Sequence, residues 1–427
     1  MSRDSLQTAP ALTALGDITG GFFRRQMLRQ MTRLNVGRLT LIHGSEKFVF
    51  GSADPDEPLR ATVRILHEDA YRQMALGGSV GTAEALMDGA WESDDLVALV
   101  RIFVRNRDVL DGLEGGMARI AKAALRLWHE RRRNTRDGSR RNIAAHYDLG
   151  NDFFGLFLDE SLMYSCAVYA HPTDTLESAQ FLKLNRICQK LDLQPGQRVV
   201  EIGTGWGSFA IHAARHFGVT VTTTTISQRQ HELATSRIEA AGLSDRIEVL
   251  LSDYRDLTGT YDKLVSIEMI EAIGHQYLDV YFAKLSSLLK PEGAALIQAI
   301  TIEDSRYSRA LTDIDFIKRY VFPGSFIPSV SAMLGAVANG TNLKLTHLED
   351  IGPSYALTLR AWRERFLAAL PQVRSQGYSE AFIRMWNFYL AYCEGGFLER
   401  SIGDVQMLLA KPDNRRAQYL PDLSPSL

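Results

Sequence analysis

From residue 198 onward, the pattern of hydrophobic and polar positions predicts strands and helices in alternation. Runs rich in β-branched residues predict strands, and longer helical segments stand between them. After a first strand over residues 198–202, the predicted elements are Val219–Ile226 (strand), Gln230–Ala241 (helix), Ile247–Leu251 (strand), Lys263–Ile267 (strand), Tyr277–Leu289 (helix) and Ala294–Ile300 (strand). This order predicts an α/β fold with a doubly wound, mostly parallel sheet that binds its ligand at the carboxyl ends of the strands.

The N-terminal part of the chain has a different pattern, and no candidate catalytic residue stands in it. Residues 1–118 combine strand-like runs with helical stretches, at Arg38–Ile42, Phe48–Phe50, Thr62–Ile65, Ala83–Met87 and Leu96–Val104. Because 427 residues exceed a typical single domain, we expect two domains. We predict a smaller α+β domain over 1–118, a linker helix over 119–141 and the α/β domain over 142–427.

The linker is strongly basic. Between Arg119 and Arg141 the chain carries nine Lys or Arg residues against Glu130 and Asp137, and Trp128 belongs to an apolar helical face in its first half. Such a helix can lie on an anionic bilayer surface. A solvated helix that packs on its own protein is the alternative interpretation.

Composition excludes several classes of protein. A net charge of −2 with 23% charged residues argues against a nucleic-acid binder. The sequence shows neither a signal peptide nor an uncharged apolar run of membrane-spanning length, so we expect a cytoplasmic protein. The three cysteines form no metal-ligand pattern with the ten histidines, and we expect reduced thiols and no metal.

The first strand of the α/β domain breaks into glycines at every second position. Gly203, Gly205 and Gly207 follow it, and a helix begins at Ser208. Glycine lets a ligand approach the backbone closely, and the helix N-terminus presents free N–H groups. A dinucleotide turn spaces its glycines G-x-G-x-x-G, whereas the spacing here fits better the turn that holds the amino-acid part of S-adenosylmethionine. A purely structural tight turn is the alternative.

Polar residues with binding chemistry follow the next strands. The acidic residue that usually accepts both ribose hydroxyls is absent after the second strand, where Thr224 and Thr225 stand. Gln230, or main-chain groups after Thr225, would then bind the ribose. Asp253 fits either a contact with adenine or a helix N-cap.

Two glutamates follow the fourth strand. Glu268 and Glu271 are three positions apart, so we expect both on one face of a short helix. One of them pairs with a basic neighbour in the plainer interpretation, and the other is a candidate acid or base.

Separate motifs stand in a fixed order from about residue 75 to about 410. They are Gly78–Trp91, His146–Phe154, Met163–Ala167, Gly203–Gly207, Thr225–Ser227, Asp253–Leu257, Glu268–His275, Phe322–Ser329, Tyr355–Trp362, Arg384–Leu390 and Cys393–Phe397. Together they resemble the cyclopropane-fatty-acyl-phospholipid synthases and mycolic acid cyclopropane synthases, a family of S-adenosylmethionine-dependent methyltransferases. The resemblance implies that 142–427 is the methyltransferase domain and 1–118 a lipid or helper domain.

The resemblance also implies the reaction. The methyl group of S-adenosylmethionine passes to the double bond of an unsaturated acyl chain of a membrane phospholipid, and the resulting carbocation closes to a cyclopropane. We therefore expect peripheral contact with the inner face of the membrane, and a homodimer is an open expectation. The residues expected to bind the cofactor are Tyr164, Ser165, Glu201, Gly203, Gly205, Gly207, Thr225, Gln230, Asp253 and Tyr254.

In this family a bicarbonate ion serves as the base. The residues that match its cysteine, glutamate, histidine, backbone and tyrosine contacts are Cys166, Glu271, Gln298, Ile300 and Tyr355. Glutamine at the histidine position donates hydrogen bonds but carries no proton at neutral pH. Glu271 is therefore expected to accept the proton from bicarbonate.

Two of the matched cysteines also have plainer interpretations. Cys166 has the alternative of a plain buried thiol. Cys393 matches the cysteine once regarded as the nucleophile of the family, and packing within a helix is its plainer role.

Three function classes stay open. The leading one is a lipid C-methyltransferase that ends in a cyclopropane or, if another proton leaves, in a methyl-branched or methylene acyl chain. The second is a small-molecule N-methyltransferase, and the third is a non-catalytic lipid-binding protein that keeps the cofactor fold.

Overall fold

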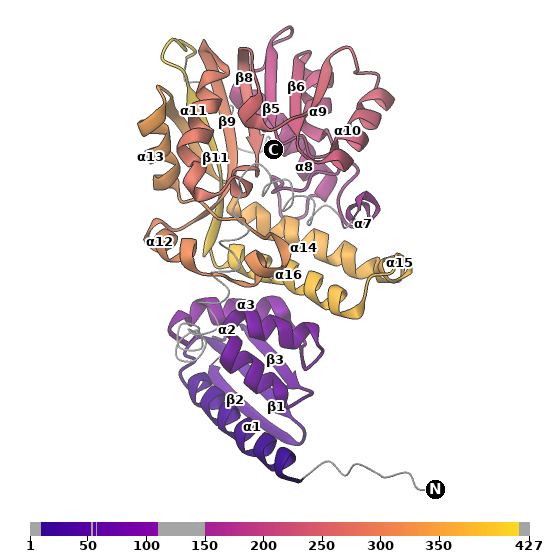
Figure 1. Cartoon of the computed structure of the whole chain (residues 1–427), viewed down its shortest axis with the longest axis vertical. Coiled ribbons are helices and arrows are strands. Elements are labelled where there is room, and N and C mark those ends of the chain that lie inside the picture. Colours follow the sequence, from indigo (N-terminus) through magenta and orange to yellow (C-terminus); the bar gives the residue numbers. More distant parts are fainter. Residues whose placement is uncertain (1–9, 53, 57, 110–149, 418–427) are drawn as a thin grey trace, which may run out of the picture. The chain divides into compact units, whose positions relative to one another are not determined.

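The computed structural model describes residues 10–52, 54–56, 58–109 and 150–417, which divide into two compact units (Figure 1). Unit 1 comprises Met1–Leu127 and Ser379–Gly395, and unit 2 comprises Trp128–Tyr378 and Gly396–Leu427. The predicted basic helix over 119–141 lies outside the described residues. The domain boundaries predicted at both of its ends therefore stay predictions.

Unit 1 is an α+β unit built on a four-stranded sheet with the order β2-β1-β3-β4. β1 pairs antiparallel with β2 and parallel with β3, and α3 packs on β1 and β3. The predicted elements of this part are confirmed, whereas α1 and β4 were not predicted. The bounds are α1 (Pro10–Met31), β1 (Gly37–His43), β2 (Glu46–Ser52), β3 (Arg60–Ile65), α2 (Asp69–Met87), β4 (Trp91–Ser93) and α3 (Leu96–Arg105), together with most of α16 (Glu380–Leu398).

Unit 2 contains a seven-stranded sheet with the order β10-β11-β9-β8-β5-β6-β7. The strands from β9 to β7 pair in parallel, and β11 and β10 add two antiparallel pairings at one edge. Their bounds are β5 (Arg198–Ile202), β6 (Thr220–Thr225), β7 (Ile247–Leu251), β8 (Tyr261–Ile267), β9 (Leu289–Ile302), β10 (Lys344–Asp350) and β11 (Ile402–Ala410). The predicted doubly wound, mostly parallel sheet is confirmed.

Helices cover both faces of this sheet because successive strand residues point to opposite sides. Val199, Val265 and Leu296 pack with α8 and α9 in one buried cluster. Their neighbours Val200 and Leu264 pack with α11 and α13 in another cluster on the opposite face. The arrangement of helices on either side of β5, β8 and β9 is visible in Figure 1.

The helices of unit 2 lie mostly between consecutive strands, as expected for a doubly wound sheet. Their bounds are α7 (Asn151–Gly155), α8 (Leu176–Leu191), α9 (Ser208–Phe217), α10 (Gln228–Ala240), α11 (Leu278–Ser287), α12 (Asp304–Thr312), α13 (Val330–Gly340), α14 (Gly352–Ala368) and α15 (Leu370–Ser375). Short helical turns occur at η1 (Tyr254–Asp256), η2 (Ile270–Ala272), η3 (His275–Tyr277) and η4 (Ile317–Val321). In the described part of the chain, no helix has the length and apolar character needed to cross a membrane.

The strand order reverses between β5 and β8, since the chain runs from β5 outward to β6 and β7 and then returns to β8 on the other side. Open parallel sheets bind their ligands at the carboxyl ends of the strands beside such a reversal. The ends of β5, β6, β8 and β9 therefore define the region in which the predicted site residues are to be sought.

Candidate active site

The glycine turn after β5 has the conformation that its sequence predicts. Gly203 and Gly205 have φ angles of 99° and 52°, a region that residues with a Cβ rarely adopt. The backbone N–H groups of Gly203 and Thr204 both donate to the carbonyl of Thr224, at 3.1 and 3.0 Å, which ties the turn to β6. A Cβ at Gly205 would meet no atom within 4 Å, so the turn presents bare backbone there. This arrangement fits the amino-acid part of S-adenosylmethionine.

Glu201, on β5 just before the turn, is held by the neighbouring strand. Its carboxylate accepts a 2.6 Å hydrogen bond from Oγ1 of Thr223, whose hydroxyl lies 2.8 Å from that of Thr204. Burial raises the pKa of Glu201 to about 8. The carboxyl group therefore has to lose its proton before it can pair with a cationic group such as a ligand amine.

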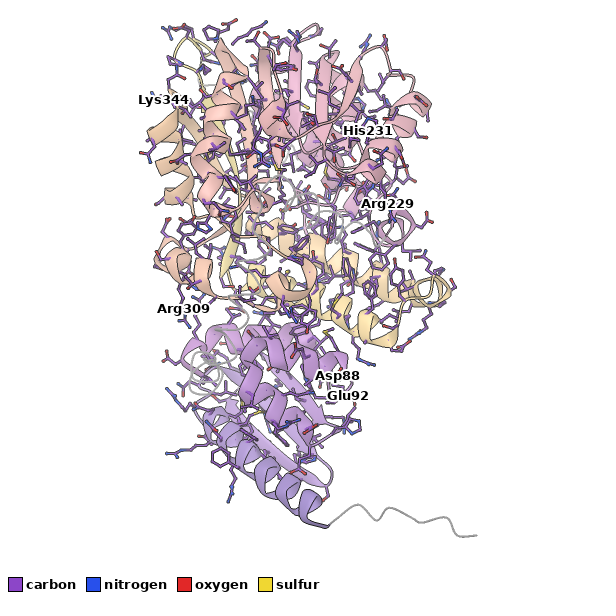
Figure 2. The ribbon with its side chains drawn as sticks, in the orientation of Figure 1. Asp88, Glu92, Arg229, His231, Arg309 and Lys344 are labelled. Atoms are coloured by element: carbon purple, nitrogen blue, oxygen red, sulfur yellow. The ribbon has the colours of Figure 1, made fainter. Side chains whose placement is uncertain are left out.

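The predicted ribose contacts lie together after β6. Oγ1 of Thr225 donates to Oε1 of Gln230 at 2.7 Å, and Ser227 caps α10 by accepting a 3.3 Å bond from the backbone N–H of Gln230. Gln230 is buried, whereas the adjacent Arg229, labelled in Figure 2, is exposed. The capped helix start thus directs the Gln230 amide toward the end of β6.

Asp253 forms the N-cap that was one of its two interpretations. It accepts a 3.0 Å bond from the backbone N–H of Arg255 and pairs through both carboxylate oxygens with the guanidinium group, at 2.8 and 2.7 Å. Tyr254 is buried, and its ring lies edge-on to Tyr281 at 5.6 Å. Burial raises the pKa of Tyr254 to about 12, so its hydroxyl keeps its proton at neutral pH.

Tyr164 and Ser165 lie in the segment between α7 and α8. Tyr164 packs in an aromatic group, with ring centroids 5.1 Å from Phe154 and 5.2 Å from Trp362. Oγ of Ser165 accepts a 2.8 Å hydrogen bond from Nζ of Lys183, which is fully buried. Burial lowers the pKa of Lys183 to about 8, and the negative charge of Glu268 opposes this shift.

Glu268 is the centre of the predicted catalytic residues. Its carboxylate accepts hydrogen bonds from the backbone N–H of Cys166 at 2.7 Å, from Nε2 of Gln298 at 2.8 Å and from the hydroxyl of Tyr355 at 2.6 Å. Cys166, Gln298 and Tyr355 are buried, while Glu268 keeps partial exposure. The structure therefore gathers three predicted residues around a carboxylate to which the sequence gave no specific role.

The expectation that Glu268 and Glu271 share a helix is wrong. Glu268 has a φ of 47°, in the left-handed region, while Glu271 lies in the separate turn η2. The backbone N–H of Glu268 continues the pairing of β8 with β9 by donating to the carbonyl of Gln298 at 2.9 Å. A left-handed residue at this point turns the chain out of the strand and directs its side chain back to the neighbouring strand. Such backbone strain in a residue with a Cβ is concentrated at functional sites.

A chain of buried polar groups fixes the orientation of the Gln298 amide. Lys190 is only a donor, so the 2.7 Å contact of its Nζ with Gln406 identifies the contacted atom as Oε1. Nε2 of Gln406 then donates to Oε1 of Gln298 at 3.1 Å, which leaves Nε2 of Gln298 facing Glu268. Gln298, Gln406 and Lys190 are each at most 1% exposed.

Asp404, on β11, is a second buried carboxyl group in the cluster. Its Oδ2 accepts a 3.2 Å bond from Nε2 of Gln298. Burial and the adjacent charge of Glu268 raise the pKa of Asp404 well above its usual range. The two carboxyl groups thus share one donor, since Nε2 of Gln298 contacts both Asp404 and Glu268.

Glu271 and Ile300 form a separate pair beside Glu268. The backbone N–H of Ile300 donates to Oε1 of Glu271 at 2.7 Å, while Oε2 of Glu271 is buried and accepts no hydrogen bond within the described residues. Burial, with a smaller contribution from the charge of Glu268, raises the pKa of Glu271 to about 8. Glu271 thus has the tuned acidity that was expected of a proton-transfer residue.

The two matched cysteines have different settings. The thiol of Cys166 is fully buried, contacts the carbonyl oxygens of Ala167 (3.1 Å) and Ile351 (3.6 Å), and has a raised pKa because of burial. It is the backbone N–H of Cys166 that reaches Glu268. Cys393 is half-buried on α16, in the part of that helix that belongs to unit 1, so its assignment stays a prediction.

These contacts decide how well the residues suit a bicarbonate ion. The N–H of Ile300 is bonded to Glu271, and the donors of Gln298 and Tyr355 are bonded to Glu268. The predicted bicarbonate donors are thus engaged by carboxylates of the chain itself. As arranged here, they do not fit an additional anion.

Sequence reasoning assigned no role to Lys183, Asp404 and Gln406. Asp404 and Gln406 are polar residues inside the otherwise apolar strand β11, which is the signal that could have marked them. Lys183 lies in α8 among other polar residues and carries no such signal. The partners of Asp404 and Gln406 lie far away in the chain, so the sequence shows that these two are unusual without showing what they contact.

Comparisons with known proteins identify the family of the chain. The model of the family described as mycolic acid cyclopropane synthetase matches residues 134–407. Tuberculostearic acid methyltransferase UfaA1 of Mycobacterium tuberculosis (strain ATCC 25618 / H37Rv) is 39% identical over 356 residues, which cover 81% of this chain and 82% of that protein. Cyclopropane-fatty-acyl-phospholipid synthase of Escherichia coli (strain K12) is 38% identical over 356 residues, covering 82% and 88%.

A solved structure gives the same indication. Mycolic acid cyclopropane synthase CmaA1, crystallised with SAH and CTAB, is 29% identical and superposes with a TM-score of 0.60 over 64% of this chain and 98% of that one. SAH is the product that S-adenosylmethionine leaves after methyl transfer. The predicted S-adenosylmethionine cofactor is therefore supported by a similar protein as well as by the turn after β5.

Proposed function

Because the chain belongs to the mycolic acid cyclopropane synthetase family of S-adenosylmethionine-dependent methyltransferases, we propose that it methylates the double bond of an unsaturated acyl chain in a membrane phospholipid. The product proposed is a cyclopropane fatty acid. The observation that carries this proposal is the partly exposed carboxylate of Glu268, held by Cys166, Gln298 and Tyr355 at the strand ends that follow the glycine turn. A cofactor turn beside a carboxylate is what methyl transfer followed by proton loss requires.

The cofactor supplies an electrophilic methyl group, and the protein must position it. Gly203, Gly205 and Gly207 would hold the amino-acid part, and Gln230 with Thr225 the ribose. An alkene is a poor nucleophile, so the enzyme has to align its π bond with the sulfonium methyl group and exclude water. The aromatic side chains of Tyr164, Tyr355 and Trp362, which contact one another, suit both tasks.

Methyl transfer leaves a carbocation, which aromatic faces and a nearby anion stabilise. Tyr355 lies between the two kinds of group, since its hydroxyl bonds to Glu268 while its ring lies 4.5 Å from that of Phe397. Loss of a proton from the new methyl group closes the ring. Loss from a neighbouring carbon gives a methyl-branched alkene. A 1,2-hydride shift followed by proton loss from the new methyl group gives a methylene chain.

The second outcome is a candidate function in its own right. The relative named tuberculostearic acid methyltransferase is 39% identical to this chain, a similarity equal to that of the phospholipid synthase at 38%. Both products arise from one carbocation, so the same active site serves either. The amine-directed alternative differs in kind, because an N-methyltransferase needs no anion beside a carbocation.

A phospholipid substrate places the enzyme at a bilayer surface. We propose that it acts as a peripheral protein on the cytoplasmic face of the membrane, with unit 1 assisting lipid access, and that two copies associate. Binding to anionic vesicles and the mass of the protein in solution test these two points directly.

The proposed reaction is tested by incubating the protein with S-adenosylmethionine and vesicles of monounsaturated phospholipid. A gain of one CH₂ in the acyl chain with upfield cyclopropyl protons is the expected result. The same gain with olefinic protons retained identifies the methylene product instead. No gain on any unsaturated lipid, with methylation of an amine panel, would overturn the lipid assignment.

A further inference from the structure

We propose that Glu268 takes the place of bicarbonate in this enzyme: its carboxylate is the anion beside the carbocation and accepts the proton that leaves. This inference rests on the methyl transfer proposed above. It adds a catalytic residue of the chain where the resemblance implies a bound ion.

The hydrogen bonds carry the argument. Three residues predicted to surround bicarbonate donate to one carboxylate. Cys166 donates through its backbone N–H at 2.7 Å rather than through its thiol, Gln298 through its amide at 2.8 Å and Tyr355 through its hydroxyl at 2.6 Å. A carboxylate and a bicarbonate ion present the same pair of acceptor oxygens. The cradle that would hold the ion thus holds Glu268.

The backbone explains how the side chain reaches this position. The left-handed φ of 47° at Glu268 turns the chain immediately after β8, and its N–H is fixed to the carbonyl of Gln298 on β9. Main chain and side chain of Glu268 are therefore both bonded to Gln298. A left-handed φ is strained for a residue with a Cβ, and packing and hydrogen bonds must offset that strain.

The other buried carboxyl group of the cluster is less suited to this role. Burial and the adjacent Glu268 raise the pKa of Asp404, and Asp404 accepts a single longer bond, 3.2 Å from Nε2 of Gln298. Among the cluster's side chains Gln298 and Asp404 are completely buried, whereas Glu268 is partly exposed. Glu268 is thus the member of the cluster that an acyl chain can reach.

The step balances without a further reactant. The π electrons of the alkene form the new C–C bond as the C–S bond breaks, and the carbocation forms. A C–H bond of the new methyl group then supplies the electron pair that closes the ring, while its proton passes to Glu268 and afterwards to water. A proton next to a carbocation is strongly acidic, so a carboxylate is able to accept it.

Two variants of Glu268 test the proposal as a matched pair. Glu268→Gln fills the same space but cannot accept the proton, and Glu268→Gly tolerates the left-handed φ while it removes the carboxylate. We expect wild-type turnover to be unchanged, within about twofold, between CO₂-depleted buffer and buffer with bicarbonate. Both variants should lose at least about 100-fold in kcat, equivalent to about 2.7 kcal/mol, and added bicarbonate or formate should restore only Glu268→Gly.

A binding measurement decides the same question without turnover. Titration of ¹³C-bicarbonate, followed by NMR line broadening, should show binding to Glu268→Gly and none to the wild-type protein. Wild-type binding of ¹³C-bicarbonate, or a wild-type rate that falls tenfold on CO₂ depletion and recovers with bicarbonate, would overturn the proposal. If no lipid is methylated under any condition, the proposed function fails, and the binding contrast still decides what occupies the cradle.

Discussion

Nζ of Lys190 donates a 2.7 Å hydrogen bond to Oε1 of Gln406, and this contact sets the orientation of the amide that faces Glu268. Because a lysine amine only donates, the amide beside it must turn its oxygen toward the amine. That amide's NH₂ group then faces the oxygen of the next amide, so each amide has a single orientation. Lys190 is therefore a positioning residue that acts through Gln406 and Gln298. Its influence on Glu268 extends from α8 through two side chains, Gln406 on β11 and Gln298 on β9.

We expect Lys190→Met to lower kcat about tenfold and to leave the KM for S-adenosylmethionine within about twofold. The substitution frees both amides to rotate, so that Gln298 no longer always donates to Glu268. Loss of the buried hydrogen bond to Gln406 and of the ion pair with Glu349 should also reduce the free energy of unfolding, by about 3 kcal/mol. Steady-state kinetics and chemical denaturation measure the two effects.

Lys263→Met is the matched control for this variant. Lys263 is also buried and also donates from Nζ, at 2.6 Å to the carbonyl of Leu191, but it lies on the early part of β8. Lys263→Met should lose less stability than Lys190→Met, because Lys190 also pairs with Glu349, and its kcat should be unchanged. Equal losses of kcat in the two variants would mean that Lys190 acts on stability alone.

The hydroxyl of Tyr355 should contribute to rate more than to stability. Tyr355→Phe removes a 2.6 Å hydrogen bond to a charged group, a bond that contributes about 1.5–3 kcal/mol. We expect kcat to fall about 10- to 100-fold, because the anion becomes less well placed for the carbocation.

Tyr71→Phe, in unit 1, is the control for loss of a buried tyrosine hydroxyl. The Tyr71 hydroxyl has no hydrogen-bond partner within the described residues. That variant should keep the wild-type rate of methyl incorporation. A Tyr355→Phe enzyme as fast as the wild type would remove Tyr355 from the active site.

Gly205→Ala should separate cofactor binding from folding. Gly205 and Gly196 both have positive φ angles, 52° and 83°, and a Cβ at either would meet no atom within 4 Å. Alanine at either position should cost about 1–2 kcal/mol of the free energy of unfolding. Gly205→Ala alone should raise the Kd for S-adenosylmethionine, by at least about tenfold, as calorimetric titration can measure.

Comparing the two variants is informative because alanine strains the backbone in the same way at both sites, while the two glycines lie at different ends of β5. Gly196 lies in the turn between α8 and β5, away from the carboxyl ends of the strands. A Gly205→Ala protein that binds the cofactor as tightly as Gly196→Ala would argue for a merely structural turn.

Glu201 predicts a specific dependence of stability on pH. Its folded pKa is about 8, above the ordinary value of 4.5, so the folded state binds this proton more tightly than the unfolded state. The stabilisation is complete below pH 4.5 and disappears as the pH rises through about 8. The loss has a limiting slope of about 1.4 kcal/mol per pH unit.

The Glu201→Gln variant has no proton to lose at this position. Its free energy of unfolding should therefore fall less steeply than that of the wild type between pH 5 and 8, as urea denaturation at several pH values can show. Parallel curves for the two proteins would mean that Glu201 is already ionised in the folded state.

The sequence alone determined the doubly wound sheet, the α+β unit before it and the glycine turn, because these depend on local periodicity and on backbone conformations that only glycine adopts readily. Strands β10 and β11 were not predicted. Their pairing at the sheet edge joins segments separated by two long helices, and no local pattern reports such a partner.

The tertiary structure decided the chemistry of the carboxylates. Sequence spacing put Glu268 and Glu271 on one helix, whereas a left-handed residue after β8 separates them. The hydrogen bonds that each carboxyl group accepts depend on donors from β9 and α14. These are long-range electrostatic and hydrogen-bonding effects, and they exist only once the sheet has brought Gln298, Asp404 and Tyr355 together.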